Sequence, residues 1–464
     1  MIHRIFWPEP KFGELPSPFL RGTERALRIT FHSSSFTEAS EEEVEAIEAL
    51  RQLSNLSEIE ALDTEPSMLP HLEIGTYKDG ADYIPITVTT PKRVIQSGIP
   101  YPHQWEVIAS QLAGQVDILH PDSQAMLADL KVAQAHRQLG YDILITLSER
   151  LLSLRTQNVL REANPCRPIE VARIVGQFLR SRNNYTWQAN HRLRHGFDRG
   201  LFYWVLVRHR LPNMWRYFNT CVIADEHRHD DTLYLGQSIL TRCVRVLQAR
   251  DAIAAEFYVP QSNNTRDAII YHFDYLTLLL SGVFDAQALI AHRAYRIKLP
   301  KERYASFRNQ EFINSLTRVR GASDLHNLIT GQNFIDLMTL LYELRNTIHK
   351  TSLPTIGYQV GLEQQQSYVI VLPDCATVIQ QAAERFGSMG EWGLMQLDEL
   401  VFEPFSYAVK LIKECYYQIN TIAITTNLDG MFPDGFVIPP LEDRPLEDGV
   451  FNEKIRKRID VLGW

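Results

Sequence analysis

The stretch Glu343-Leu344-Arg345-Asn346-Thr347-Ile348-His349-Lys350 decides the fold we expect, because it ends an amphipathic pattern with charged and titratable side chains. Apolar residues recur at three- and four-residue spacing over residues 333–350, which predicts a helix with one buried face. Arg345 and His349 stand four residues apart, a spacing that places both side chains on one helix face. Because an arginine neutralises phosphate charge and a histidine transfers protons near neutral pH, the pair suits chemistry on a phosphodiester.

The same residues also have a purely structural explanation. Burying an unpaired arginine costs several kcal/mol, so the pair must face a groove, a partner surface or a counter-charge. Asp274 or Asp285, on a long helix expected at residues 267–297, could supply that charge. Basic residues in a last helical turn also complement the helix dipole, and Lys350 fits this role without any chemistry.

Outward from this helix, the sequence predicts a mainly α, multi-domain protein. Helical spacing marks further segments at 125–154, 168–182, 200–220, 232–256, 374–386 and 404–420. The first hundred residues are mixed, with a strand at 27–31, a helix at 41–62, and a hairpin of residues 72–77 and 83–89 around Asp79-Gly80. Pro85 suggests an edge strand there. A second hairpin is expected within 357–372, and the tail from Asn427 reads as an extended arm with little core of its own.

We therefore expect four regions along the chain. They are a small mixed α+β N-terminal domain (1–104), a helical Arg-rich middle domain (105–244), a helical bundle (245–425) and an extended C-terminal tail (426–464).

Composition places the chain among soluble globular proteins. Of its 464 residues 45% are hydrophobic and 22% charged, and the formal charge of −8 argues against indiscriminate nucleic-acid or membrane binding. Five scattered cysteines fit a reducing cytoplasm. The longest apolar run, Tyr275 to Phe284, is far shorter than the roughly 20 residues that span a membrane, so we expect a buried core helix and a cytoplasmic protein.

The segment from Leu344 to His349 resembles the active-site motif of the HEPN superfamily of helical-bundle ribonucleases, and residues 267–297 resemble the first core helix of such bundles. The resemblance covers about residues 245–425, and the three residues between Arg345 and His349 are fewer than the motif usually has. It implies RNA cleavage without a metal or other cofactor. In that chemistry His349 would act as general acid or base, Arg345 would stabilise phosphoryl charge, and Asn346 would hold the site by hydrogen bonds. It also implies a homodimer, with RNA (tRNA being one candidate) as substrate and an antitoxin or other protein as a further partner.

A second candidate surface is the arginine belt, which we define as residues 150–216. It contains thirteen arginines, no lysine and three acidic residues, a local charge of 13 − 3 = +10, with aromatic residues interleaved. Arginine clamps phosphate and aromatic rings stack on bases, so we expect RNA contacts there. The residues expected to bind nucleic acid are Arg180, Arg182, Tyr185, Trp187, Arg192, Arg194 and, outside the belt, Lys350. The alternative is a set of arginines paired with acidic residues of the same chain or of another subunit.

These observations favour an endoribonuclease of prokaryotic defence or toxin biology, with the upstream region controlling or targeting it. A non-catalytic protein that binds RNA or a nucleotide and assembles with a partner remains an alternative, as does a structural helical protein whose belt closes an oligomer. The run at 225–231 has two histidines among acids but no second ligand group at metal-site spacing, so we expect no metal.

Overall fold

The computed structural model describes residues 25–77, 81–90, 93–100, 104–154, 163–190, 192–228, 231–257, 262–353, 355–360, 364–370, 394–396, 399–402, 404–432 and 453–463. The chain is mainly α-helical and carries a mixed sheet in its N-terminal part. It divides into two compact units: unit 1 comprises residues 1–197 and 453–464, and unit 2 comprises residues 198–452.

Unit 1 is built on a seven-stranded sheet in the order β5-β4-β3-β2-β1-β6-β7. The strands are β1 (Leu27–Phe31), β2 (Ile59–Asp63), β3 (His71–Ile74), β4 (Tyr83–Thr89), β5 (Val94–Pro100), β6 (Ile143–Ile145) and β7 (Pro165–Cys166). Strands β3, β2, β1, β6 and β7 run parallel, whereas β4 and β5 are antiparallel additions at one edge. Leu27, Ile29 and Phe31 on one face of β1 and Thr30 on the other are fully buried, as expected for a central strand covered on both faces.

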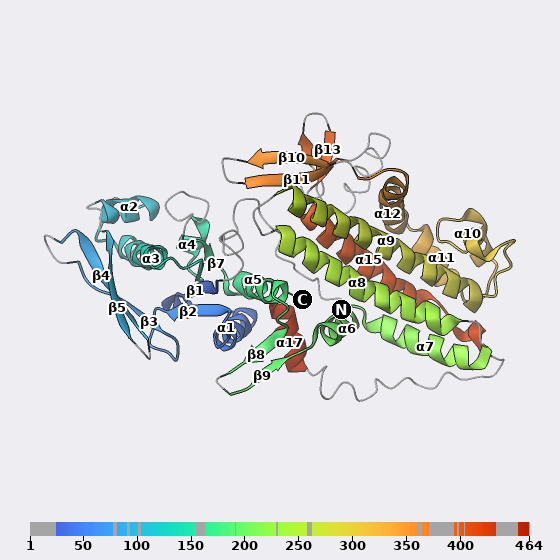
Figure 1. Cartoon of the computed structure of the whole chain (residues 1–464), viewed down its shortest axis with the longest axis horizontal. Helices are drawn as coiled ribbons and strands as arrows, with labels where there is room; N and C mark the ends of the chain where they lie inside the picture. The colour runs from blue at the N-terminus through green and yellow to red at the C-terminus, as the bar shows by residue number, and fades with distance from the viewer. Residues whose placement is uncertain are drawn as a thin grey trace. The chain divides into compact units, whose positions relative to one another are not determined.

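Helices cover both faces of this sheet (Figure 1). Helices α2 (Trp105–Leu112), α3 (Pro121–Gln138) and α4 (Glu149–Ser153) lie on one face, and α1 (Glu41–Leu53) and α5 (Pro168–Ser181) pack together on the other. A separate two-stranded hairpin of β8 (Thr186–Ala189) and β9 (Arg194–Gly196) follows α5.

Unit 2 is a helical bundle with a small sheet. Its longest helices, α8 (Thr232–Phe257) and α9 (Asn263–Ala294), pack along each other, and α15 (Pro404–Thr425) and α12 (Gln332–Lys350) pack against α9 (Figure 1). The other helices are α6 (Arg199–Arg210), α7 (Pro212–Arg228), α10 (Gln310–Leu316) and α11 (Ser323–Thr330). The sheet has the order β10-β11-β13-β12, with strands Thr355–Val360, Gln364–Ile370, Glu399–Phe402 and Leu394–Gln396.

Several expected elements are confirmed. Residues 27–31 form β1, the expected Asp79-Gly80 hairpin is β3 and β4, and the hairpin within 357–372 is β10 and β11. The long helix begins earlier than expected, because Ser262 and Thr265 form a capping box at its first turn. The helix expected at 374–386 lies outside the described residues.

The expected domain boundaries are wrong. Residues 105–244 are not a helical middle domain, since their first part supplies β6 and β7 to the N-terminal sheet and the boundary at 244 falls inside α8. These two strands have three and two residues and are buried throughout, so they show no alternation of apolar and polar residues.

Three local predictions also need correction. The helix expected at 41–62 stops at Leu53, where the Ser54 hydroxyl bonds to the carbonyl of Leu50, and β2 follows. Pro85 is not on an edge strand, because β4 pairs with both β3 and β5. Its carbonyl accepts from the N–H of Gly75 just beyond the end of β3, and because proline has no N–H this terminal pair lacks the return bond.

The tail is not only an extended arm. Its last part is helix α17 (Glu453–Val461), which buries Ile455, Ile459 and Val461 in unit 1. Residues 433–452 lie outside the described residues.

Candidate functional site

Helix α12 carries the candidate site at its C-terminal end. Phe334, Leu337, Leu341 and Leu344 are buried and fix the helix against the bundle. Because side chains four residues apart lie above one another, the last turn presents Arg345 and His349 beside this apolar stripe. His349 and Lys350 are exposed, and Arg345 is half-buried.

Asp285 of α9 fixes the position of the Arg345 guanidinium. The Nη1 atom of Arg345 lies 2.8 Å from Asp285 Oδ2, with side-chain exposures of 30% and 38%. The Tyr342 hydroxyl donates to the other oxygen of the same carboxylate. Burial, followed by the Asp285 charge, raises the pKa of Tyr342, so this hydroxyl stays a proton donor. The carboxylate therefore orients the arginine and offsets part of its charge.

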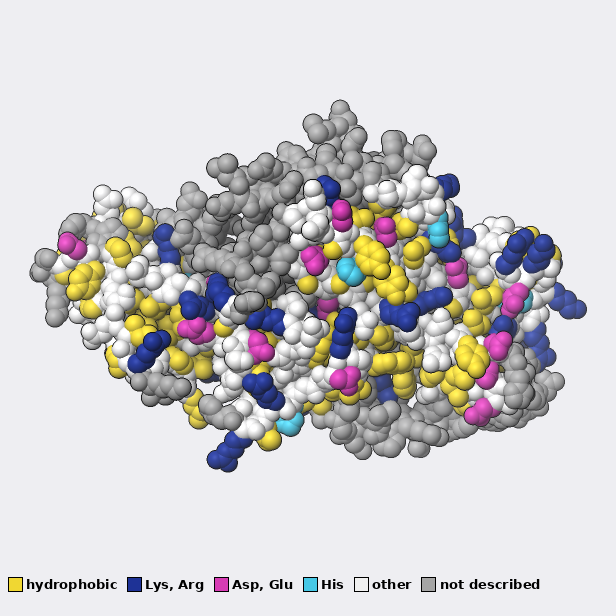
Figure 2. Space-filling model, in the orientation of Figure 1, with side chains coloured by type: hydrophobic (Ala, Val, Ile, Leu, Met, Phe, Trp, Pro, Cys, Tyr) yellow, Lys and Arg dark blue, Asp and Glu magenta, His cyan; other side chains and the backbone are white. Residues whose placement is uncertain are grey.

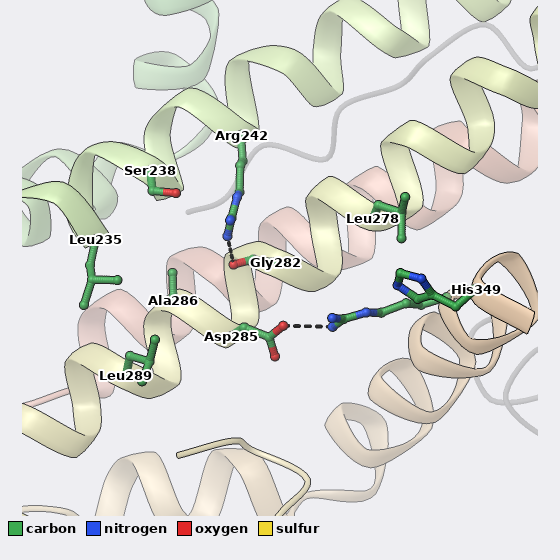
Figure 3. A pocket seen from close by; sticks show the side chains of 10 residues that line it. Leu235, Ser238, Arg242, Leu278, Gly282, Asp285, Ala286, Leu289 and His349 are labelled. Carbon is green, nitrogen blue, oxygen red and sulfur yellow. Dashed lines mark hydrogen bonds and ion pairs between the residues drawn. The ribbon is translucent and has the colours of Figure 1, made fainter. Parts of the chain in front are cut away.

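A cavity of about 420 Å³ lies beside this pair (Figure 3). It is lined by α8, α9 and α12, through Leu235, Ser238, Arg242, Leu278, Gly282, Asp285, Ala286, Leu289, Arg345 and His349. Figure 3 shows the His349 ring on α12, and the ion pair of Arg345 with Asp285 joins α12 to α9. The cavity thus combines two guanidiniums, an imidazole, a carboxylate and a hydroxyl on a partly apolar wall.

Arg242 is a site residue that the sequence did not suggest. Its guanidinium donates to the carbonyl of Gly282, in the middle of α9. A Cβ on Gly282 would lie 2.7 Å from Arg242 Nη1, so a larger residue at this position would displace the guanidinium. That glycine, within a long apolar helix, was the only signal in the sequence.

Other expected site residues stand apart from the cavity. Asn346 is half-buried but does not line it. Asp274 lies eleven residues before Asp285, about 16 Å along the helix. Its Oδ1 is buried without a hydrogen-bond partner among the described residues, and burial raises its pKa to about 6. Of the two expected counter-charges, it is Asp285 that bonds Arg345.

The arginine belt does not behave as one basic surface. Arg180 and Tyr185 are 5% and 6% exposed and belong to the core of unit 1, so the prediction that they bind RNA is wrong. Arg180 donates to Gln177 Oε1 and to the carbonyl of Leu462. Arg182 stacks on Phe178 and donates to the carbonyl of Arg25.

The belt is also divided between the units, because residues 150–197 lie in unit 1 and 198–216 in unit 2. On the face drawn in Figure 2, basic side chains are dispersed, with acidic ones between them. In the hairpin of β8 and β9, Arg192 and Arg194 are exposed, and the Trp187 ring stacks on His195 at 5.5 Å. RNA binding by this hairpin stays a prediction.

Metal and membrane sites receive little support. Within the described ranges, no group of three or more His, Cys, Asp and Glu side chains could hold a metal ion, although the run at 225–231 is described only in part. By length and composition, α9 alone among the described helices could cross a membrane. However, 67% of its most apolar window is buried inside the protein, as in core helices of soluble proteins.

No family model, curated protein or solved structure matches this chain. The geometry of the α8–α9–α12 cavity and the resemblance of the α12 motif are therefore the grounds on which a function is argued.

Proposed function

We propose that unit 2 is a metal-independent endoribonuclease of the HEPN type, acting in prokaryotic defence or toxin biology. The observation that carries this proposal is that Arg345 and His349 line one cavity, with Arg345 held by Asp285. A fixed cation beside an exposed imidazole supplies the two functions that cleavage of a phosphodiester needs, charge stabilisation and proton transfer.

The reaction would be an internal transesterification. The ribose 2′-oxygen bonds to the adjacent phosphorus, the bond from phosphorus to the 5′-oxygen breaks, and the products are a cyclic phosphate and a 5′-hydroxyl. His349 removes the proton of the 2′-hydroxyl, and the His349 of a second copy delivers a proton to the leaving oxygen. Arg345 and Arg242 stabilise negative charge on the phosphoryl oxygens.

A non-catalytic RNA- or nucleotide-binding protein is the second candidate. It is favoured by the Asp285 carboxylate, which already offsets the charge of Arg345. The cavity would then bind a phosphate without moving a proton.

Incubation of the full-length protein with total cellular RNA in EDTA distinguishes the endoribonuclease from the non-catalytic binding protein. Wild type should cleave under activating conditions, whereas Arg345→Ala and His349→Ala should not. Arg318→Ala, at an exposed arginine of the same unit, is the matched control and should cleave like wild type. Intact RNA with wild type, or cleavage that survives both site substitutions, would exclude the enzyme; retained RNA binding would then favour the second candidate.

A further inference from the structure

The order in which the chain adds strands to the sheet of unit 1 reverses between β1 and β6. From β1 the chain moves to β2 through α1 on one face, whereas from β6 it moves to β7 through α4 on the opposite face. In open α/β sheets, ligands bind outside the carboxyl ends of the strands at such a switch point. The residues at this end therefore need a chemical explanation, and none belongs to the α8–α9–α12 cavity.

Polar side chains gather where these strands end. His32 and Ser33 follow β1, Asp63 ends β2, Thr146 follows β6, and Asp129 comes from α3. All five are at most 9% exposed. Burying polar groups costs free energy unless they are hydrogen-bonded, and a structural core would use apolar residues here.

One half of the cluster surrounds Asp63. The Ser33 hydroxyl donates to Asp63 Oδ1 at 2.6 Å, and the backbone N–H of Glu65 donates to the same oxygen at 3.1 Å. Arg51 of α1 reaches Ser33 Oγ at 2.9 Å and Asp63 Oδ2 at 3.2 Å. The Arg51 side chain is nevertheless 43% exposed, so its guanidinium extends from a buried carboxylate to solvent.

The other half surrounds Asp129. Ser148 Oγ donates to Asp129 Oδ2 at 2.5 Å, and Arg150 Nε lies 2.9 Å from the same oxygen with 45% of its side chain exposed. His32 joins this half, with Nδ1 3.0 Å from Thr146 Oγ1 and Nε2 3.8 Å from Asp129 Oδ1. Burial lowers the pKa of His32, so its ring is a neutral hydrogen-bonding group.

The strand register sets the distance between the halves. Phe31 is paired with Asp63 on one side and with Ile145 on the other, so three strand ends lie in one row. Strands lie about 4.8 Å apart, which separates the outer two by about 10 Å. The hydroxyl-rich segment Ser33–Ser35 occupies the middle of this row, and Ser34 is exposed.

We propose that the carboxyl end of this sheet binds a phosphorylated sugar, either free or as part of a nucleotide. Arg51 and Arg150 take the phosphate, since each carries N–H donors beyond those its carboxylate uses. The exposed Ser34 and the half-buried Ser35 take the sugar hydroxyls, whereas the buried Asp63 holds Ser33 and Arg51 in place. Here side chains replace the glycine-rich loop, which the sequence lacks. This proposal is independent of the ribonuclease proposal.

Isothermal titration of the full-length protein with adenosine monophosphate, ribose 5-phosphate, inorganic phosphate and adenosine tests it. At least one phosphorylated sugar should bind, and adenosine should bind at least ten-fold more weakly. Equal affinity for the two phosphorylated compounds identifies a sugar phosphate, whereas a preference for the monophosphate identifies a nucleotide.

The variants are Arg51→Ala, Arg150→Ala and Ser34→Asp. Each should weaken binding at least ten-fold. Ser34→Asp adds a negative charge at an exposed position and should leave the fold intact, so the test survives even if an arginine variant unfolds. The matched control is Arg28→Ala, which removes a 40%-exposed arginine paired with Glu60 near the opposite end of β1, and it should bind like wild type. No binding of either phosphorylated sugar at millimolar concentration, or unchanged binding in folded variants, would overturn the proposal.

Discussion

Arg345 and His349 differ in what holds them, and this difference predicts different kinetic effects. Arg345 is fixed by Asp285 and carries charge in both the bound and the reacting state, so Arg345→Ala should reduce RNA affinity as well as the cleavage rate. The exposed His349 would contribute mainly proton transfer, worth roughly 100- to 10,000-fold in rate. Single-turnover cleavage with separate binding measurements checks this. A His349→Ala variant that loses binding as strongly as Arg345→Ala would argue for a binding site without proton transfer.

His136 in unit 1 predicts how stability depends on pH. It is fully buried, its Nδ1 lies 2.9 Å from Thr30 Oγ1, and burial lowers its pKa from 6.5 to about 3. Between pH 6.5 and about 3, the unfolded chain binds a proton at His136 and the folded chain does not. The contribution of neutral His136 to the free energy of unfolding is therefore complete above pH 6.5, and it decreases by at most about 1.4 kcal/mol for each pH unit below that.

Urea unfolding of wild type and His136→Gln at pH 7.5 and 5.5 measures this contribution. The variant cannot titrate at this position, so it should lose less stability than wild type between the two values, by about 1 kcal/mol. Equal losses in the two proteins would show that His136 does not make this contribution.

The β8–β9 hairpin is the element of the arginine belt that can still contact RNA. Arg192→Glu with Arg194→Glu should weaken RNA binding, and each lost phosphate contact should reduce the salt slope by about 0.7. Arg93→Glu, at an exposed position elsewhere in unit 1, serves as control. Filter binding across a salt series gives the slopes, and identical slopes in all three proteins would remove the hairpin from the RNA surface.

Helix α17 ties the end of the chain into unit 1. Arg458 is 1% exposed and lies 3.1 Å from Glu45 of α1. Arg458→Ala removes a buried cation and its packing, and we expect a loss of about 2–4 kcal/mol in thermal or urea unfolding. The neighbouring Lys457 is exposed on the same helix, so Lys457→Ala should leave stability nearly unchanged. A stable Arg458→Ala protein would mean that α17 adds little to unit 1.

Helices and strands were predicted correctly where the apolar pattern repeats several times along the sequence. The helices at 263–294, 332–350 and 404–425 repeat their apolar residues over several turns, and their existence and type were expected. Strands β6 and β7 were missed because three and two buried residues give no period. At the site, the spacing of Arg345 and His349 was visible in one helix, whereas Arg242 comes from a helix about 100 residues earlier and is brought there only by packing.

At the scale of the molecule, unit 2 is inserted into the chain of unit 1. The chain leaves unit 1 at Phe197 and returns at Glu453 to complete it with α17. The expected linear order of four domains failed because strand order and this return depend on contacts distant in sequence. The two candidate sites lie in different units, so the proposed sugar-phosphate site and the proposed ribonuclease site can be tested independently.

The proposed reaction also makes a prediction about assembly. It removes one proton from the 2′-hydroxyl and delivers one to the leaving oxygen, and each copy contributes one His349 to its cavity. If two copies share these roles, the rate per chain should fall on dilution through the range where sedimentation shows a dimer dissociating. Excess His349→Ala chains mixed with wild type should suppress cleavage by forming mixed dimers with one imidazole, whereas excess Arg318→Ala should not. A rate per wild-type chain that stays constant in both experiments would mean that a single copy contains the whole catalytic site.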